Sequence, residues 1–324
     1  MARLLRGVVK KDIHPRVCWA ALNTIKEYCK HLSPRFQEDC HQHVLGALRK
    51  AMEDFEYPSV QAQASSAMFY FVKNCDAYIL KPYLKKLVGK LIDQIERGKC
   101  MVKVEALRAL SSIANSSKDQ FEEFYSTVMP YLKAMMMTAK ADSDSILLAA
   151  SMECITIIWM VVGKERIGTN DAERKVGEVL ISLIRPELEE NNRMRIQVLQ
   201  ACGRLCKILG QDFRPYNMVA IPCLLKAAKN ESYVFVPENP DNMEESDGRT
   251  LIVEGQKTWI KTEVLEQKVI ACSELYRCAA ELKEDFYLWI EEVAGILVPL
   301  LNFEYNEEIR RVAALGIFVL MSFA

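Results

Sequence analysis

A helix-opening motif that recurs along the chain constrains the fold more than any other sequence feature. It occurs at His14–Ala21 and at Tyr57–Ala64, where a proline is followed by valine and then alanines, and a related form occurs at Glu307–Ala314. Proline suits the first helical position because its missing N–H would be unpaired there in any case, and alanines let two helices approach closely. Such openings, repeated with an amphipathic helix between them, are the pattern of HEAT repeats.

The same two-helix unit can be followed through the rest of the sequence. Its register advances by roughly 41 to 49 residues except at one insertion, close to the HEAT period. Paired helices of this kind bury their apolar stripes only by stacking, with first helices on the convex face and second helices on the concave face. Further second helices are expected at 99–115, 142–162, 191–209 and 258–282, and first helices at 34–52, 77–97, 118–138, 165–186, 211–229 and 284–303.

These units predict an all-α HEAT-repeat solenoid, with one continuous array of about seven repeats over residues 1–324 and no β-sheet. The first and last repeats are expected to be incomplete. Met1 stands just before a second helix, and Ala324 ends the apolar run Leu315–Ala324, whereas a solenoid normally carries polar caps at its ends. This pattern indicates a piece of a longer array or a truncated gene product.

Composition excludes several classes of protein. Half of the residues are hydrophobic, which is ample for a core, but no run of eighteen apolar residues predicts membrane insertion, and the first residues do not resemble a signal peptide. The chain has 42 basic and 43 acidic residues and no basic stripe, which argues against nucleic acid as the main partner. The eleven cysteines are scattered singly on apolar helix faces, so Cys154, Cys206 and Cys272 are expected to be buried and unpaired.

No pattern predicts catalysis, a cofactor or a metal site. The sequence lacks a nucleophile elbow, a P-loop, an HExxH motif and a GxGxxG motif, so we expect no enzyme activity. Cys40, His41 and His43 are close together, but positions i and i+2 face different sides of a helix and no further ligand completes a zinc site.

The insertion at residues 231–257 departs most clearly from the repeat. It carries seven acidic residues against two basic ones, and its prolines and glycines are incompatible with a packed helix. We therefore expect an acidic loop within a repeat, with its densest charge at Glu244, Glu245 and Asp247. Such a loop is either a contact site for a basic surface or a solvated surface loop.

Several longer stretches resemble the importin-five branch of the karyopherin-β nuclear transport receptors. Each could be ordinary helix-packing chemistry, but their order and spacing over nearly the whole chain are specific. The stretches are Gly203–Gly210 followed by Phe213 and Tyr216, Glu153–Ile155 with Val162–Glu165, Pro82–Leu84, Ala280–Glu284 with Phe286, and Val298–Leu301 with Phe303. The likeness is to the central repeats of a receptor about three times as long.

The resemblance implies a nuclear import function. Receptors of this family bind cargo proteins with basic localisation signals on the concave face, bind Ran-GTP, and dock phenylalanine-glycine nucleoporins on the convex face while shuttling between cytoplasm and nucleus. They carry an acidic insertion at the corresponding place, proposed to contact Ran or basic cargo, although here its acidic cluster is thinner. The resemblance also implies polar cargo contacts along an exposed concave stripe that includes Trp19, Asn23, Gln63, Tyr70 and Asn74.

Two features of that stripe do not fit basic cargo. Tyr70 stands where the family pattern leads us to expect an asparagine, and Lys26 has the same charge as a basic signal. An ordinary polar helix face is therefore an alternative interpretation of the stripe. A static HEAT scaffold that assembles a protein complex is the alternative function, and a non-functional piece is a third possibility. Only the transport function requires sensitivity to the nucleotide on Ran.

Overall fold

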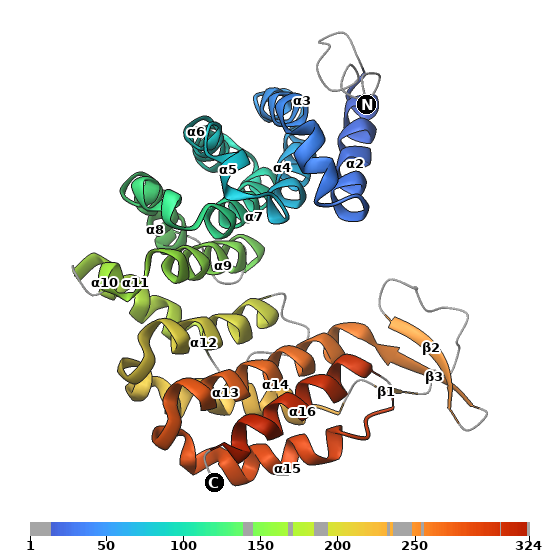
Figure 1. The fold of residues 1–324 in the computed structure, drawn as a ribbon, viewed down its shortest axis with the longest axis vertical. Coiled ribbons are helices and arrows are strands. Elements are labelled where there is room, and N and C mark those ends of the chain that lie inside the picture. Colours follow the sequence, from blue (N-terminus) through green and yellow to red (C-terminus); the bar gives the residue numbers. More distant parts are fainter. Residues whose placement is uncertain are drawn as a thin grey trace. The chain divides into compact units, whose positions relative to one another are not determined.

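In the computed structural model the chain divides into two compact units, Met1–Arg174 and Lys175–Ala324. The structure describes residues 14–138, 145–167, 171–184, 194–231, 234–235, 248–253, 256–304 and 306–322. In both units the dominant element is a pair of antiparallel helices (Figure 1). This helix pair is the repeating unit that the predicted HEAT-repeat solenoid requires.

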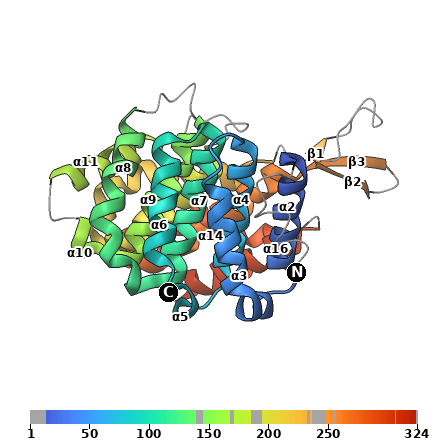
Figure 2. The ribbon, with the colours of Figure 1, turned by 90° about the horizontal axis from the view of Figure 1, so that it is seen from above.

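The second helices of unit 1 follow one another side by side in sequence order, as Figures 1 and 2 both show. They are α2 (Pro15–His31), α4 (Pro58–Lys73), α7 (Cys100–Ser117) and α9 (Ser145–Val162). Proline occupies the first turn of α2 and of α4, where the sequence motif placed it. Small buried residues along α4, namely Ala62, Ala64, Ser65 and Ala67, let α2 and α7 pack closely on either side of it.

The first helices form the other layer of unit 1 (Figure 1). They are α3 (Arg35–Met52), α6 (Leu84–Arg97) and α8 (Tyr125–Thr138), with the single turns α5 (Ala77–Leu80) and α10 (Lys164–Ile167). The helix predicted at 77–97 is broken between α5 and α6, where Pro82 lies, and the one predicted at 118–138 begins with a 3₁₀ segment, η1 (Lys118–Phe124). Helix α11 (Asp171–Ser182) crosses the division between the units.

Helix α9 is the one described helix that is long and apolar enough to cross a membrane. Its apolar side chains instead lie in the core, where Ile155, Ile158 and Trp159 are fully buried and α7 and α8 pack against the helix. The indole nitrogen of Trp159 donates to the Tyr125 hydroxyl over 3.3 Å. A helix that is apolar on most sides is typical of a protein core.

Unit 2 repeats the arrangement. Its second helices α12 (Arg195–Leu209), α14 (Thr262–Leu282) and α16 (Glu307–Met321) pack in sequence order, with first helices α13 (Asn217–Lys229) and α15 (Ile290–Leu300) against them. The 3₁₀ segments η2 (Gly210–Tyr216) and η4 (Lys283–Trp289) lead into these first helices. Phe213 and Phe286, one from each segment, are fully buried at equivalent places in successive repeats.

A small antiparallel sheet in unit 2 makes the prediction of a chain without β-sheet wrong. Strands β1 (Val234–Phe235), β2 (Gly248–Val253) and β3 (Gln256–Lys261) lie in the order β1-β3-β2, and Thr250 pairs with Trp259 (Figure 1). Strand β3 leads directly into α14, so residues 258–261, predicted as helix, are strand. The insertion at 231–257 therefore contributes strands to this sheet, and the helix pairs of unit 2 on either side of it are intact.

A sharp backbone turn recurs where second helices end. Lys118, Gly163, Gly210 and Lys283 follow α7, α9, α12 and α14 and have positive φ angles of 47°, 83°, 55° and 50°. Positive φ is favourable for glycine but strained for lysine. The shared backbone geometry marks the same junction in four successive repeats, although only two of the four carry the residue that the geometry favours.

Candidate functional site

The residues predicted to contact cargo lie on α2, on α4 and directly after α4. Trp19 is 42% exposed on α2, and Tyr70 is half-buried on α4. Asn74 follows the last residue of α4 and is exposed. Glu244, Glu245 and Asp247 lie outside the described residues. The structure therefore places five of the eight predicted residues, all in unit 1.

Gln63 does not belong to an exposed stripe, contrary to the prediction. It is 8% exposed, and its side-chain nitrogen donates to the Asn23 amide oxygen over 3.1 Å. The neighbouring Ser66 is also buried, because α4 is covered by α2 on one side and α7 on the other. This hydrogen bond links α4 to α2. Because Gln63 is buried, it can affect a partner protein only by holding the Asn23 side chain in position.

An aromatic pair, Phe69 and Tyr70, lies at the exposed end of α4 and gathers cations from three helices. The two ring centroids are 5.0 Å apart with the rings perpendicular. The ammonium groups of Lys26 and Lys30, both on α2, lie 5.3 and 4.8 Å from the Tyr70 centroid. On Phe69, the Arg108 guanidinium from α7 lies at 5.0 Å and the Lys73 ammonium at 6.0 Å. All four distances are within the range of a cation–π contact.

Two carboxylates accompany these four cations. Glu27 accepts from Lys30 over 2.9 Å, and that hydrogen bond lowers the pKa of Glu27 and raises the pKa of Lys30. Glu105 accepts from Arg108 over 3.1 Å. Lys26 and Lys73 have no carboxylate within ion-pair distance among the described residues. The aromatic pair is therefore surrounded by net positive charge.

A groove adjoins the aromatic pair at the carboxyl ends of α2, α4 and α7. Its volume is about 840 Å³, and it is open to solvent. Its lining contains one lysine from the end of each helix or the residue after it, namely Lys30, Lys73 and Lys118. Asn74 and Asn115 add amides and Asp76 a carboxylate. We call this surface the lysine groove. Its charge is opposite to that expected for a site that grips a basic signal.

The last turn of α4, which carries the aromatic pair, is fixed from both sides. The amide of Gln37 on α3 donates to the Phe71 carbonyl over 3.3 Å. From α7, the hydroxyl of Ser112 donates to the Phe69 carbonyl over 3.2 Å and that of Ser116 to the Val72 carbonyl over 2.9 Å. The last carbonyls of a helix lack partners within the helix, so these bonds stabilise its end. They also hold Phe69 and Tyr70 in place.

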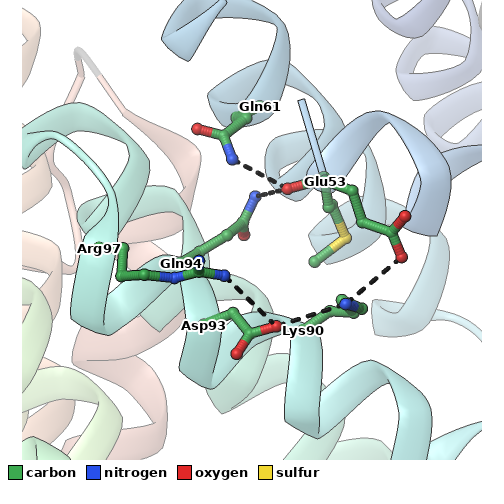
Figure 3. A network of polar contacts seen from close by, with 7 residues as sticks. Glu53, Gln61, Lys90, Asp93, Gln94 and Arg97 are labelled. Carbon is green, nitrogen blue, oxygen red and sulfur yellow. Dashed lines mark hydrogen bonds and ion pairs between the residues drawn. The ribbon is translucent and has the colours of Figure 1, made fainter. Parts of the chain in front are cut away.

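A buried amide network fixes the other end of α4, as Figure 3 shows. The Met52 carbonyl, at the end of α3, accepts from Gln61 over 2.9 Å and from Gln94 over 3.2 Å. The Ser65 hydroxyl donates to the amide oxygen of Gln94 over 2.6 Å. Because Gln61 and Ser65 belong to α4 and Gln94 to α6, three helices share one buried set of hydrogen bonds.

Charged residues surround that network on the surface of unit 1. Lys90 lies 3.4 Å from both Glu53 and Asp93, and Arg97 lies 3.9 Å from Asp93 (Figure 3). The Arg97 guanidinium also lies over the Phe55 ring. These residues are substantially exposed, so solvent screens the ion pairs and they contribute little to stability. The basic residues here, Lys90 and Arg97, have acidic neighbours within ion-pair distance, unlike Lys26 and Lys73 at the aromatic pair.

The sequence is related to known import receptors over almost its whole length. No protein-family model matches it. Importin subunit beta-3 of Saccharomyces cerevisiae is 30% identical over 315 residues, which cover 96% of this chain and 29% of the yeast protein. The chain is homologous to yeast importin subunit beta-3. A probable importin-5 homolog of Dictyostelium discoideum is 22% identical over 227 residues, covering 70% of this chain and 20% of that relative. The chain thus spans less than a third of the length of these relatives.

Solved structures agree with this relationship. Kap121p bound to Pho4p superposes with a TM-score of 0.84 at 29% identity, covering 99% of this chain and 31% of that chain. Kap121p bound to Nup53p gives a TM-score of 0.81 at the same identity. The predicted resemblance to the importin-five branch and the predicted HEAT-repeat solenoid class are both confirmed.

Proposed function

We propose that this chain is a cargo-handling segment of a nuclear import receptor that shuttles between cytoplasm and nucleus. The observation that carries the proposal is the homology to importin subunit beta-3 over 96% of the chain. Solved structures of the similar Kap121p contain that protein bound to Pho4p, to Nup53p and to Ste12p. A receptor segment of this type works by binding proteins, without catalysis or a cofactor. The proposal includes a single HEAT array over residues 1–324, supported by the same helix pairing in both units.

Exposed apolar side chains on the first-helix layer of unit 2 support docking of phenylalanine-glycine nucleoporins. Met218 on α13, Leu288 in η4 and Val298 on α15 are all more than half exposed. Large apolar side chains that stay in contact with water mark interaction surfaces when they gather on one layer. Phenylalanine side chains from nucleoporin repeats are the partners expected for this layer.

The acidic insertion supports a role in electrostatic recognition. Glu244, Glu245 and Asp247 form its densest negative cluster, and we propose that they contact a basic surface on Ran-GTP or on a cargo protein. The five predicted residues of unit 1 belong to the same proposal as cargo contacts. Of these, Trp19, Tyr70 and Asn74 are accessible to a partner, while Gln63 acts through Asn23.

The response to Ran separates this function from static scaffolding. The experiment immobilises the full chain, loads it with a nuclear and cytoplasmic extract, and elutes with Ran carrying either a non-hydrolysable GTP analogue or GDP. A receptor segment releases its bound proteins with the GTP form and retains them with the GDP form. Equal retention of the same proteins under both conditions would instead establish a static HEAT scaffold. Grafting the chain between the flanking repeats of yeast importin subunit beta-3 tests whether Ran acts through those repeats.

A further inference from the structure

We propose that the lysine groove and the adjoining aromatic pair of unit 1 bind an acidic linear segment of a partner protein. This docking surface is distinct from the acidic insertion and goes beyond the binding of basic cargo signals. Several cations of unit 1 lie close together on this open groove and beside the aromatic pair, and not all of them have an acidic neighbour.

The groove and the aromatic pair carry an excess of positive charge. Lys26, Lys73 and Lys118 have no carboxylate within ion-pair distance among the residues that the structure describes. Lys30 and Arg108 are paired, with Glu27 and Glu105, and Asp76 is the one further carboxylate on the groove lining. The groove and the aromatic pair thus bring five cations together with three carboxylates. Like charges gathered on a surface favour a partner of the opposite sign.

The cations of this surface are preorganised by their neighbours. Cations over aromatic faces lose part of their freedom before a ligand arrives, and Tyr70 holds both Lys26 and Lys30 in this way. The turn that carries Tyr70 is itself fixed by Gln37, Ser112 and Ser116. A ligand that binds here orders few additional side chains, which lowers the entropic cost of binding.

The repeat sets the spacing of the groove lysines. Lys30 lies at the end of α2, Lys73 at the end of α4 and Lys118 directly after α7, so three successive repeats contribute one lysine each. Packed helices lie about 8–10 Å apart. A polyproline II segment rises about 3.1 Å per residue with three residues per turn, so every third side chain faces the same way at intervals of about 9 Å. In a segment with an acidic residue at every third position, the spacing of the carboxylates therefore matches the expected spacing of Lys30, Lys73 and Lys118.

The groove also offers groups for the backbone of such a segment. Asn74 and Asn115, from consecutive repeats, belong to its lining together with the lysines. Amide side chains both donate and accept, so they suit the unpaired N–H and C=O groups of an extended peptide. Nucleic acid fits less well, because a phosphate backbone needs a long basic tract and the whole chain has a net charge of −1.

The test uses fluorescence anisotropy with the full chain and four labelled probes. The first is a peptide of four Glu-Pro-Pro triplets, which is stiff in the polyproline II conformation. The second has the same composition with all glutamates at one end, the third replaces glutamate by lysine, and the fourth is a short oligothymidylate. We expect the evenly spaced acidic peptide to bind about tenfold more tightly than the block isomer, with an affinity that falls as salt rises.

Charge variants assign the binding to the groove. Lys26→Glu with Lys73→Glu should weaken the acidic peptide about tenfold, whereas replacing the same two lysines by arginine should preserve binding. The matched control is Lys85→Glu with Lys86→Glu, which makes the same change in net charge at two exposed positions of α6 in the other layer. Thermal unfolding of each variant checks that the fold is retained.

Three results would overturn the inference. They are a stronger binding of the lysine or thymidylate probe, equal binding of the even and block peptides, and equal losses from the groove pair and from the control pair. None of these results depends on release by Ran-GTP, so the import function and this inference can fail separately.

Discussion

The carboxylate of Glu274 on α14 occupies the space directly above Gly203 on α12. A Cβ atom on Gly203 would lie 2.5 Å from Cδ of Glu274 and closer still to its oxygen. Glu274 is 5% exposed and accepts from Arg277 over 2.8 Å. Gly203 therefore allows two successive second helices of unit 2 to pack around a buried charge. The glycine belongs to the Gly203–Gly210 stretch that resembles the importin-five branch.

Gly203→Ala should destabilise the protein by about 1–3 kcal/mol, because the new methyl group forces Glu274 out of its position in a packed interface. Urea unfolding monitored by circular dichroism measures the change. Gly295→Ala is the matched control in the same unit, since nothing lies within 4 Å of a Cβ built on Gly295. The control should be neutral or stabilising by roughly 0.5–1 kcal/mol. Similar losses in both variants would show that Gly203 has no special role in packing.

The same carboxylate should make stability depend on pH. Burial raises the pKa of Glu274 above the usual glutamate value, against the opposing effect of Arg277 and Arg204. The Glu274 carboxyl therefore keeps its proton in the folded protein at pH values where the unfolded chain has lost it. The free energy of unfolding consequently falls as pH rises from the usual glutamate pKa through the raised pKa. In Glu274→Gln that contribution is absent. As pH rises over this range, the free energy of unfolding of the variant should therefore increase relative to that of the wild type. A constant difference would contradict the raised pKa.

The two lysines with positive φ should be replaceable by glycine with a gain in stability. Lys118 and Lys283 adopt the junction geometry that Gly163 and Gly210 adopt after other second helices. Relief of strain, about 1–3 kcal/mol, exceeds the roughly 0.4–1 kcal/mol lost because glycine is more flexible in the unfolded chain. Lys118→Gly and Lys283→Gly should each stabilise by about 0.5–1 kcal/mol in urea unfolding. The reverse change, Gly210→Lys, should destabilise. A loss in both glycine variants would mean that the lysine side chains contribute more than the strain costs.

Sequence alone predicted the helix pairs well because their apolar stripes repeat at the helical period. It missed the sheet because the prolines, glycines and acidic residues of 231–257 were interpreted only as loop signals. The run Thr250–Val253, in which every residue except Leu251 is β-branched, is separated by two residues, Glu254 and Gly255, from Gln256–Ile260. That combination is itself a hairpin signal.

The site was less predictable for a different reason. An amphipathic helix was assumed to have one exposed polar face, but α4 is packed on both sides by α2 and α7, so Gln63 is buried. The cations around the aromatic pair Phe69 and Tyr70 come from successive second helices, which are about forty residues apart in sequence because of the repeat. No local pattern brings Lys26 and Arg108 to one pair of rings. Lys26 and Lys30 on one face of α2 were the available signal for a basic surface.

Thiol labelling should separate the cysteines by burial. Cys154, Cys206 and Cys272 are buried and form no disulfide, as predicted. Burial raises the pKa of Cys272 to about 11 and raises that of Cys154 further, so little reactive thiolate forms near neutral pH. With iodoacetamide on the native protein, the exposed Cys100 should react first, and Cys154 and Cys272 should react only after addition of urea. Mass spectrometry of the digested protein gives the order. Equal rates at Cys100 and Cys272 in the folded protein would contradict the packing of unit 2.

Reversal of the acidic cluster tests whether it contacts a basic partner. If Glu244, Glu245 and Asp247 bind a basic surface on Ran-GTP or cargo, changing all three to lysine should weaken that binding and leave the free energy of unfolding nearly unchanged. Attraction between exposed charges is screened over about 8 Å at physiological ionic strength, so wild-type affinity should also fall as salt rises. The reversed chain should lose most of that salt dependence.

The measurement uses the chain grafted between the flanking repeats of yeast importin subunit beta-3, with Ran-GTP and a lysine-rich signal peptide as ligands at two salt concentrations. Three exposed carboxylates on the first-helix layer of unit 1, Glu38, Glu96 and Glu123, provide a control with the same change in net charge. A contact site requires that the cluster reversal weaken binding more than the control does, because nonspecific attraction depends on net charge whereas a contact depends on position. Equal effects of the two reversals, or unchanged affinity and salt slope for both ligands, would mean that the acidic insertion is a solvated loop and that recognition lies elsewhere on the helices.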